Sequence, residues 1–309
     1  MKLLMIRPGA LGDTLLMLPA LTELRGKTTI YFVGRQPGLD YISDAVFRAM
    51  DLERAGWHRL FLEQPFPSGS SPLPVSDADR VLAFFKDEEG IILQNLKRFF
   101  PKAEVFVFPS FPPKFQRIHV ARYLAECLAS AGLPLNSHAV MDEAAGSPLI
   151  SAPCSSRKRD CVVFHPGSGD LKKNHSTEFW LHIFQFCSGT DRFSQFKPTL
   201  LLGPAEISQK AFFESWTDVQ RPMKILLCPK KEHLLRVLGS AALYLGHDSG
   251  ITHLSGLMGT PTVALFKETD PVQWGPLGPH VQIIHRWKTD RKLLELVKTA
   301  VSTMASVEG

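Results

Sequence analysis

Short runs rich in β-branched and aromatic residues alternate along the chain with stretches of helical periodicity, and this alternation restricts the fold more than any other feature. Such an alternation predicts parallel sheets with helices on both faces, and therefore an α/β fold. The runs that predict strands are 2–7, 28–34, 58–63, 80–85, 104–109, 161–164, 199–203, 223–228, 241–246, 261–266 and 281–285.

Helices are expected between these runs, and three of them have clear limits, at 13–25, 38–50 and 117–131. Pro19 lies inside the first and must kink it or remove a hydrogen bond. Gly132 ends the third, because glycine readily adopts the left-handed conformation that closes a helix. An amphipathic C-terminal helix is defined by Leu293, Leu294, Val297, Ala300, Val301 and Met304.

Segment 136–159 mixes small, polar and charged residues without a strong apolar period, which is typical of a linker. We therefore expect two parallel α/β domains, residues 1–150 and 151–309, that face each other across a central cleft. The C-terminal helix is assigned to the second domain, and the sequence leaves open whether it also packs back on the first. The Pro- and Ser-rich segment 64–76 is a long loop, and loops of this length are often functional lids or mobile segments.

The composition is that of a globular protein, with 44% hydrophobic and 21% charged residues. No apolar segment reaches the roughly 18 residues of a membrane span, and the apolar start is too short for a signal peptide, so a cytoplasmic protein is expected. The cysteines are scattered and form no C-x-x-C pair, which argues against disulfides and zinc. A net charge of +5 without an arginine-rich block argues against nucleic acid and suits anionic small molecules or a membrane surface.

The first candidate site is the turn 7–13 (RPGALGD), which connects the first predicted strand to the first helix. Ligands of open α/β sheets bind beyond the carboxyl ends of the strands, so this turn should face a ligand. Gly9 and Gly12 allow the backbone to approach that ligand, and the Asp13 carboxylate can act as a base. Asp13 is also a good N-cap for the helix, and catalysis and capping have equal weight on spacing alone.

The second candidate is 164–170 (FHPGSGD), again directly after a predicted strand and followed by Lys172 and Lys173. Free N–H groups in such a turn can bind an anion, and a lysine can supply a point charge to a phosphate. The segment is neither a Walker loop nor a dinucleotide-binding fingerprint, because both consensus patterns are absent. An ordinary glycine-rich turn is the alternative interpretation.

The third and most specific candidate is 245–254 (LGHDSGITHL). The Asp-Ser-Gly corner at 248–250 opens a helix whose first N–H groups and positive dipole end suit a diphosphate. His253 lies early in that helix. A phosphate contact and an ordinary buried or capping histidine are both open for it.

Together these motifs resemble the bacterial heptosyltransferases of glycosyltransferase family 9, and they occur in the family's order along nearly the whole chain. The resemblance rests on 7–13 with Pro19, 165–169 with Lys173, 248–250 with His253, 259–266 (GTPTVALF), 269–271, 274–276 and Gly278. It implies a GT-B fold with two Rossmann-like domains, the first (1–150) binding the acceptor and the second (151–309) binding the nucleotide sugar.

The resemblance also implies the reaction, which is an inverting transfer from an ADP-heptose donor without a metal or other cofactor. The implied acceptor is an anionic glycolipid such as the lipopolysaccharide core, reached by peripheral contact with the inner membrane. Asp13 matches the family's catalytic carboxylate, and Glu206 resembles the residue that binds the ribose hydroxyls. The remaining donor-binding positions are Ser168, Gly169, Lys173, Gly203, Asp248, Ser249, Gly250 and His253, and sugar or acceptor contacts are assigned to Arg7, Gly12, Thr269 and Asp270.

Three departures from the family pattern concern the substrates. His175 stands where an aromatic residue is usual, Lys267 and Glu268 replace Gly-Pro, and 57–115 does not align, which leaves the acceptor unassigned. The alternatives are an α/β oxidoreductase, which the missing fingerprint disfavours, a sugar-nucleotide epimerase or hydrolase of the same architecture, and a non-catalytic nucleotide-sugar-binding protein. Asp13 argues against the last, since a binding module needs no base.

Overall fold

The computed structural model describes residues 1–63, 73–113, 115–152, 159–216, 223–285 and 290–304, which form two compact units. The units are Met1–Glu143 and Ala144–Gly309, so the division falls inside a helix of the expected linker, before residue 150. Most of the predicted loop 64–76 lies outside the described residues. Among the described helices, none is long and apolar enough to cross a membrane.

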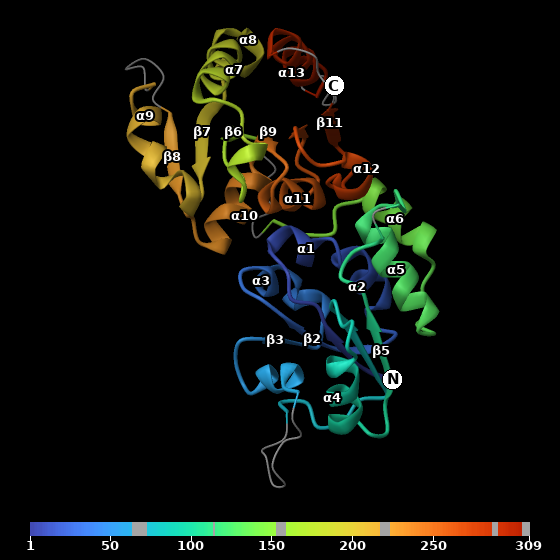
Figure 1. The fold of residues 1–309 in the computed structure, drawn as a ribbon. Helices are drawn as coiled ribbons and strands as arrows, with labels where there is room; N and C mark the ends of the chain where they lie inside the picture. The colour runs from blue at the N-terminus through green and yellow to red at the C-terminus, as the bar shows by residue number, and fades with distance from the viewer. Residues whose placement is uncertain (64–72, 114, 153–158, 217–222, 286–289, 305–309) are drawn as a thin grey trace. The chain divides into compact units, whose positions relative to one another are not determined.

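The first unit contains a five-stranded parallel sheet with the order β3-β2-β1-β4-β5 (Figure 1). Its strands are β1 (Lys2–Ile6), β2 (Thr29–Gly34), β3 (Arg48–Asp51), β4 (Arg80–Phe84) and β5 (Glu104–Phe108). Leu4 and Ile6 on one face of β1 belong to a buried cluster, while Leu3 and Met5 are buried on the other, as expected for a sheet covered on both faces.

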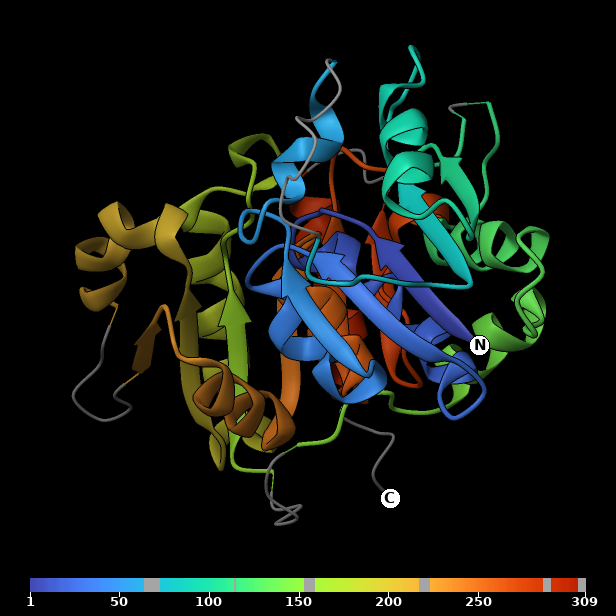
Figure 2. The ribbon, with the colours of Figure 1, turned by 90° about the horizontal axis from the view of Figure 1, so that it is seen from below.

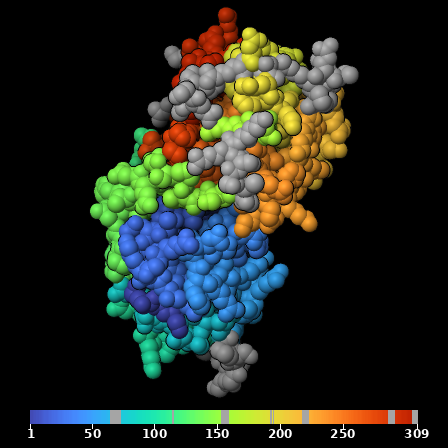
Figure 3. All heavy atoms as spheres, turned by 180° about the vertical axis from the view of Figure 1, so that it is seen from behind, coloured from blue at the N-terminus to red at the C-terminus, as the bar shows by residue number. Residues whose placement is uncertain are grey.

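Helices cover both faces of this sheet (Figures 1 and 2). The helix α4 (Ile91–Phe99) and the 3₁₀ helix η2 (Trp57–Phe61) pack together over one face. The other elements are α1 (Leu11–Leu15), α2 (Leu18–Leu24), α3 (Gly38–Ile42), η1 (Ser43–Ala45), α5 (Val120–Ser130) and α6 (Ser137–Gly146). Among these, α1 packs on α3 and α2 packs on α5. The surface of the first unit is coloured blue to green in Figure 3.

Three sequence predictions for this unit were wrong in detail. The predicted strand 58–63 is largely the helix η2, and the carbonyls of Leu60 and of the C-cap Leu62 accept hydrogen bonds from Asn95 Nδ2 of α4 (3.1 and 2.8 Å). The predicted helix 38–50 ends at Ala45, because the following residues pair with β2 as the edge strand β3. The predicted helix 13–25 is divided into α1 and α2, with Pro19 in the first turn of α2, where proline is tolerated.

The second unit contains a six-stranded parallel sheet with the order β11-β10-β9-β6-β7-β8. Every strand predicted in this half is confirmed, namely β6 (Cys161–His165), β7 (Lys197–Leu202), β8 (Lys224–Leu227), β9 (Ala241–His247), β10 (Thr262–Phe266) and β11 (Val281–His285). Long apolar runs such as that of β9, which is buried throughout, favour a central strand.

The helices of the second unit again lie on both faces of its sheet (Figure 1). They are η3 (Leu171–Lys173), α7 (Thr177–Gly189), α8 (Asp191–Ser194), η4 (Pro204–Gln209), α9 (Lys210–Glu214), α10 (Lys231–Gly239), α11 (Gly250–Leu257), α12 (Pro271–Trp274) and α13 (Asp290–Met304). The C-terminal helix α13 packs against α7, β10 and β11, and its buried residues join the core of the second unit. Its described residues therefore belong to the second unit.

Candidate functional site

The strand order of the second sheet brings the predicted donor residues to one edge. The chain runs outward from β6 through β7 and β8, then returns to β9 on the other side of β6 and continues through β10 and β11. The adjacent strands β6 and β9 thus form the topological switch point, where open α/β sheets bind ligands. His165 at the end of β6 lies opposite Gly246 near the end of β9, so the second and third motifs leave the sheet side by side.

The segment after β6 is folded back on itself by Ser168, which is buried. Its Oγ lies 2.7 Å from the carbonyl oxygen of Asp170 and 2.7 Å from Oδ1 of Asn174. Asp170 Oδ1 accepts a hydrogen bond from the Lys172 N–H (3.0 Å) at the start of η3. These contacts occupy the Ser168 side chain in shaping the turn, whereas Gly169 is exposed.

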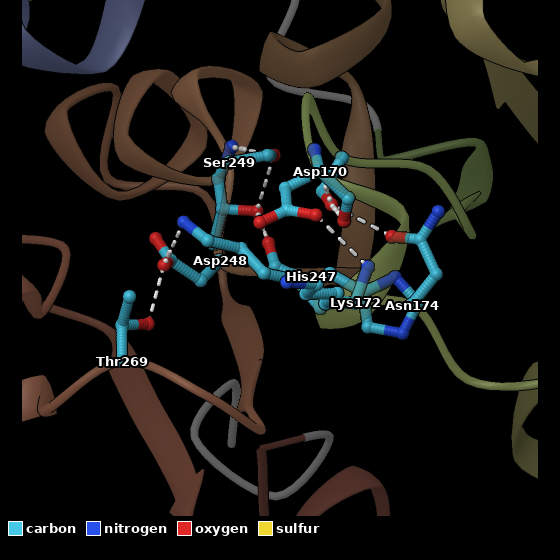
Figure 4. A network of polar contacts seen from close by, with 10 residues as sticks. Asp170, Lys172, Asn174, His247, Asp248, Ser249 and Thr269 are labelled. Carbon is cyan, nitrogen blue, oxygen red and sulfur yellow. Dashed lines mark hydrogen bonds and ion pairs between the residues drawn. The ribbon is translucent and has the colours of Figure 1, made fainter.

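Lys173 is held by an ion pair with Asp248 of the third motif, and Figure 4 labels this aspartate and its neighbour Thr269. Its Nζ lies 2.7 Å from Oδ2 of Asp248, and the same oxygen accepts a hydrogen bond from Thr269 Oγ1 (2.5 Å). The Asp248 side chain is only 8% exposed while that of Lys173 is 25% exposed, so the carboxylate is shielded and the ammonium reaches solvent. The structure therefore joins three predicted residues, with Asp248 and Thr269 contacting each other and fixing the Lys173 charge.

The helix α11 begins beside this ion pair. Ser249 is its N-cap, and its Oγ accepts a hydrogen bond from the Thr252 N–H (3.3 Å), as the Asp-Ser-Gly corner predicts. The first N–H groups of a helix and its positive dipole end attract anions, and Gly250 places no side chain over them. His253 is buried within α11, which is the core position left open by the sequence as an alternative to a phosphate contact.

Glu206 follows β7, the next strand of the sheet. Its Oε2 accepts a hydrogen bond from the Gly203 N–H (2.9 Å), while the buried Oε1 has no hydrogen-bond partner among the described residues. Burial raises the pKa of this carboxyl group. A Cβ on Gly167 would overlap the carboxyl group, so the glycine of the second motif makes room for Glu206.

A layer of buried polar side chains supports the two strand ends, and the sequence analysis did not identify it. Tyr244 Oη lies 2.8 Å from His165 Nδ1 and 3.0 Å from Thr252 Oγ1. Burial lowers the pKa of His165 to about 4 and that of His247 well below its usual range, with His175 and His165 adding to the shift of His247. Both imidazoles are therefore neutral at pH 7. The feature of the sequence that could have indicated this layer is that His165 and His247 are each the last residue of an apolar strand.

The first motif lies in the first unit, at the carboxyl end of β1. Asp13 is the third residue of α1 and not its N-cap, which is Ala10, so the predicted N-cap role is corrected. Its Oδ2 accepts a hydrogen bond from the Ala10 N–H (2.9 Å), and no described residue bonds to its Oδ1. A Cβ on Gly9 would clash with the Asp13 side chain, and Gly12 lies within α1.

Arg7 was predicted to contact the sugar or acceptor, but its side chain is buried. Its Nη1 donates to the Ser110 carbonyl (2.7 Å), and the guanidinium lies 5.5 Å from the ring centroids of both Phe84 and Phe111. Burial lowers its pKa to about 10. Arg7 follows β1, and its side chain contacts Phe84 at the end of β4 and Ser110 just after β5. Asp270, which was also predicted to contact the sugar or acceptor, lies in the second unit and caps α12 by accepting a hydrogen bond from the Val272 N–H (3.1 Å).

The described residues contain no group of three or more His, Cys, Asp or Glu side chains arranged to hold a metal ion. The sequence does contain an Asp-x-Asp segment, a common metal–diphosphate clamp, at 77–79. Asp77 is an ion-pair partner of Lys2 (2.8 Å), and Asp79 accepts from the Lys2 N–H (2.7 Å), so both lie where β1 and β4 begin, away from the carboxyl ends of the strands.

Comparison with known proteins agrees with this picture. Residues 103–300 match the model of glycosyltransferase family 9 (heptosyltransferase). Similar solved structures are E. coli heptosyltransferase WaaC with ADP (16% identity, 98% of this chain and 100% of that chain, TM-score 0.69) and E. coli ADP-heptose lps heptosyltransferase II (13%, 99% and 98%, 0.67). A family 9 glycosyl transferase from Veillonella parvula DSM 2008 is also similar (15%, 98% and 97%, 0.67). No curated protein matches in sequence. The likenesses confirm the predicted GT-B fold class.

Proposed function

The chain belongs to glycosyltransferase family 9, the heptosyltransferase family, and on this basis we propose that it transfers a heptose from ADP-heptose to an acceptor hydroxyl, with inversion and without a metal ion. ADP is favoured because it is bound in the similar structure of WaaC, and heptose because a second similar protein is an ADP-heptose heptosyltransferase. The proposed acceptor is an anionic glycolipid of the lipopolysaccharide inner-core type, which the net charge of +5 suits. The proposed location is the cytoplasmic side of the inner membrane.

The observation that carries this proposal is the position of Lys173 beside the start of α11. A diphosphate leaving group gains negative charge as its bond to the anomeric carbon breaks, and fixed positive charge at that point lowers the barrier. The Lys173 ammonium, held by Asp248 at 2.7 Å, and the first N–H groups of α11 supply such charge from adjacent strand ends. Charge from these groups takes the role that a metal ion has in other enzymes.

Glu206 supports the nucleotide end of the same proposal. Its Oε1 is buried and has no partner among the described residues, and a buried acceptor of this kind is costly unless a donor reaches it. Ribose hydroxyls are suitable donors. The carboxyl end of β7 lies next to that of β6, so ribose at Glu206 and diphosphate at Lys173 would occupy neighbouring positions along one sheet edge.

Asp13 is proposed as the general base. One carboxylate oxygen is engaged by the Ala10 N–H, while Oδ1 is available to accept the proton of the acceptor hydroxyl. The resulting alkoxide oxygen attacks the anomeric carbon from the face opposite to the diphosphate, and ADP departs with the bonding electrons. Attack from the opposite face gives inversion.

The donor assignment is tested by calorimetry with ADP, GDP, UDP and CDP, in the presence of a chelator and again with added magnesium. We expect ADP to bind most tightly and its affinity to be the same with and without magnesium. Tighter binding of another nucleotide would exclude the ADP assignment, and loss of binding in the chelator would exclude the metal-independent one.

The base assignment is tested by Asp13→Asn in a transfer assay with ADP-heptose and a lipopolysaccharide-core acceptor. An asparagine oxygen can still accept from the Ala10 N–H, so stability and ADP affinity should change little. Turnover should fall by roughly 10²- to 10⁴-fold, the usual contribution of a general base. Normal turnover of the variant would show that Asp13 only accepts the hydrogen bond from the Ala10 N–H and that the base is another residue.

A further inference from the structure

The peptide group between Asn174 and His175 has both of its polar atoms held by side chains from neighbouring strand ends. The His175 N–H donates to Nε2 of His247 (3.0 Å), and the Asn174 carbonyl oxygen accepts from Nζ of Lys267 (3.3 Å). His247 ends β9 and Lys267 follows β10, so the peptide is hydrogen-bonded by side chains from the ends of two strands of the sheet. Figure 4 shows His247 beside Asn174 at this point.

This peptide group belongs to none of the described helices or strands. It lies between η3, which ends at Lys173, and α7, which begins at Thr177. Backbone groups outside helices and sheets need side-chain or solvent partners, and hydrogen bonds at both the N–H and the carbonyl restrain the orientation of a peptide group. Two of the three departures from the family pattern, His175 and Lys267, therefore meet at one peptide.

The His247 ring is suited to this contact. A backbone N–H can only donate, so Nε2 must carry no proton, and the burial that lowers the pKa of His247 keeps the ring neutral. The ring is fully buried and packs edge-on against Trp180, with centroids 5.1 Å apart. It is therefore a fixed acceptor.

We propose that His247 is a positioning residue for the donor site, which acts with Lys267 to clamp the Asn174–His175 peptide and so aims the Lys173 ammonium at the donor diphosphate. This inference rests on the proposed function. The end of β9 then acts on Lys173 in two ways. His247 fixes the backbone next to Lys173, and Asp248 holds the Lys173 Nζ, which lies 2.7 Å from its Oδ2. A lysine held in place loses less side-chain freedom when the diphosphate binds, and the donor is bound more tightly as a result.

The first test measures the clamp without nucleotide, by hydrogen exchange of the amides at 171–176. His247→Leu removes the acceptor at similar volume, His247→Gln keeps an acceptor, and Lys267→Met removes the exposed half of the clamp without disturbing the core. We expect faster exchange in His247→Leu and Lys267→Met and near-normal exchange in His247→Gln. Unchanged exchange in both His247→Leu and Lys267→Met overturns the clamp, whatever the protein binds.

The second test measures ADP affinity by calorimetry in the intact chain. We expect His247→Leu to weaken ADP binding by about tenfold, the cost of ordering one freed side chain when a ligand binds, and His247→Gln by less than about threefold. In a Lys173→Met background, His247→Leu should have almost no further effect, because it acts through Lys173. If the losses of ADP affinity caused by His247→Leu and Lys173→Met multiply in the double variant, the positioning role is overturned. Lys172→Met is the matched control and should bind ADP normally.

The two tests separate failure of this inference from failure of the proposed function. A wild-type chain that binds no ADP contradicts the ADP assignment, while exchange at 171–176 still decides whether the clamp exists. If His247→Leu does not fold, Lys267→Met provides the same double-mutant comparison. We expect Lys267→Met to weaken ADP binding by about threefold in the wild-type chain and to have almost no effect on it in the Lys173→Met variant.

Discussion

Gly167 and Glu206 depend on each other at the level of single atoms. A methyl group at residue 167 would overlap the Glu206 carboxyl group, whereas one at Gly169 would meet no atom within 4 Å. We expect Gly167→Ala to push the carboxylate away from the Gly203 N–H, to lower stability by about 1–3 kcal/mol through overpacking, and to weaken ADP binding. Gly189→Ala, at a position outside the site where a methyl group would also meet no atom within 4 Å, should change neither. Thermal unfolding and calorimetry of the two variants check this, and equal effects would contradict it.

The buried histidines predict how stability depends on pH. His165 has a pKa of about 4 in the folded protein, against about 6.5 in an unfolded chain. Between these values the unfolded state binds the proton that the folded state excludes, so stability is complete above about pH 6.5 and falls as the pH is lowered to about 4. The loss from His165 alone is on the order of 3 kcal/mol, and His247 shifts in the same direction.

This dependence is measured by urea unfolding between pH 7 and 4.5. His165→Gln should flatten the acid limb of the stability curve, because the residue that titrates differently in the two states is gone. His58→Gln, at an exposed position, is the control and should leave the slope unchanged. An identical slope in wild type and His165→Gln would contradict the assignment.

At the scale of single residues, the sequence predicted the type of residue at the strand ends and not its contact partners. The residue types at the strand ends were read correctly as polar and glycine-rich, but their partners were not visible. Asp248 was assigned to the diphosphate, and the structure has its carboxylate paired with Lys173, 75 residues away in the chain. No spacing rule predicts such a contact, because it depends on which strands are neighbours.

At the scale of elements, α4 is stabilised by a residue that precedes it. Asp87 accepts hydrogen bonds from the N–H groups of Ile92 (3.0 Å) and Leu93 (2.9 Å). We expect Asp87→Ala to destabilise the protein by about 1–2 kcal/mol, as for loss of a helix cap. Glu88→Ala removes only an exposed pair with Lys86 and should cost less than about 0.5 kcal/mol. Urea unfolding distinguishes the neighbouring carboxylates, and similar losses would contradict the capping role.

The elements divide into two classes by how well local pattern predicts them. Central strands such as β1, β6 and β9 were identified because their apolar runs are long enough to be buried on both faces. The edge strand β3 and the 3₁₀ helix η2 were missed, since β3 is formed by pairing with β2 and η2 is held by Asn95. Their conformations follow from tertiary partners and not from their own sequence.

At the scale of the whole molecule, the residues proposed to bind the donor all belong to the second unit. We expect ADP to slow hydrogen exchange at 166–175, 203–206 and 247–254, because binding opposes the local opening of the segments that contact it. Peptides from residues 1–143 should exchange at the same rate with and without ADP. Strong protection of the first unit by ADP alone would contradict the assignment of the donor to the second.

The amino-acid sequence by itself determined the α/β class, most of the central strands, the position of three motifs at strand ends and the family. These follow from hydrophobic periodicity, from turn chemistry and from residue order, all of which are local along the chain. Only the tertiary structure decided the strand order, the edge strand β3, the ion pair of Lys173 with Asp248 and the grip of His247 on the peptide before His175. The physical reason is that hydrogen bonds and ion pairs between distant segments exist only once the sheet has set which strand ends lie side by side.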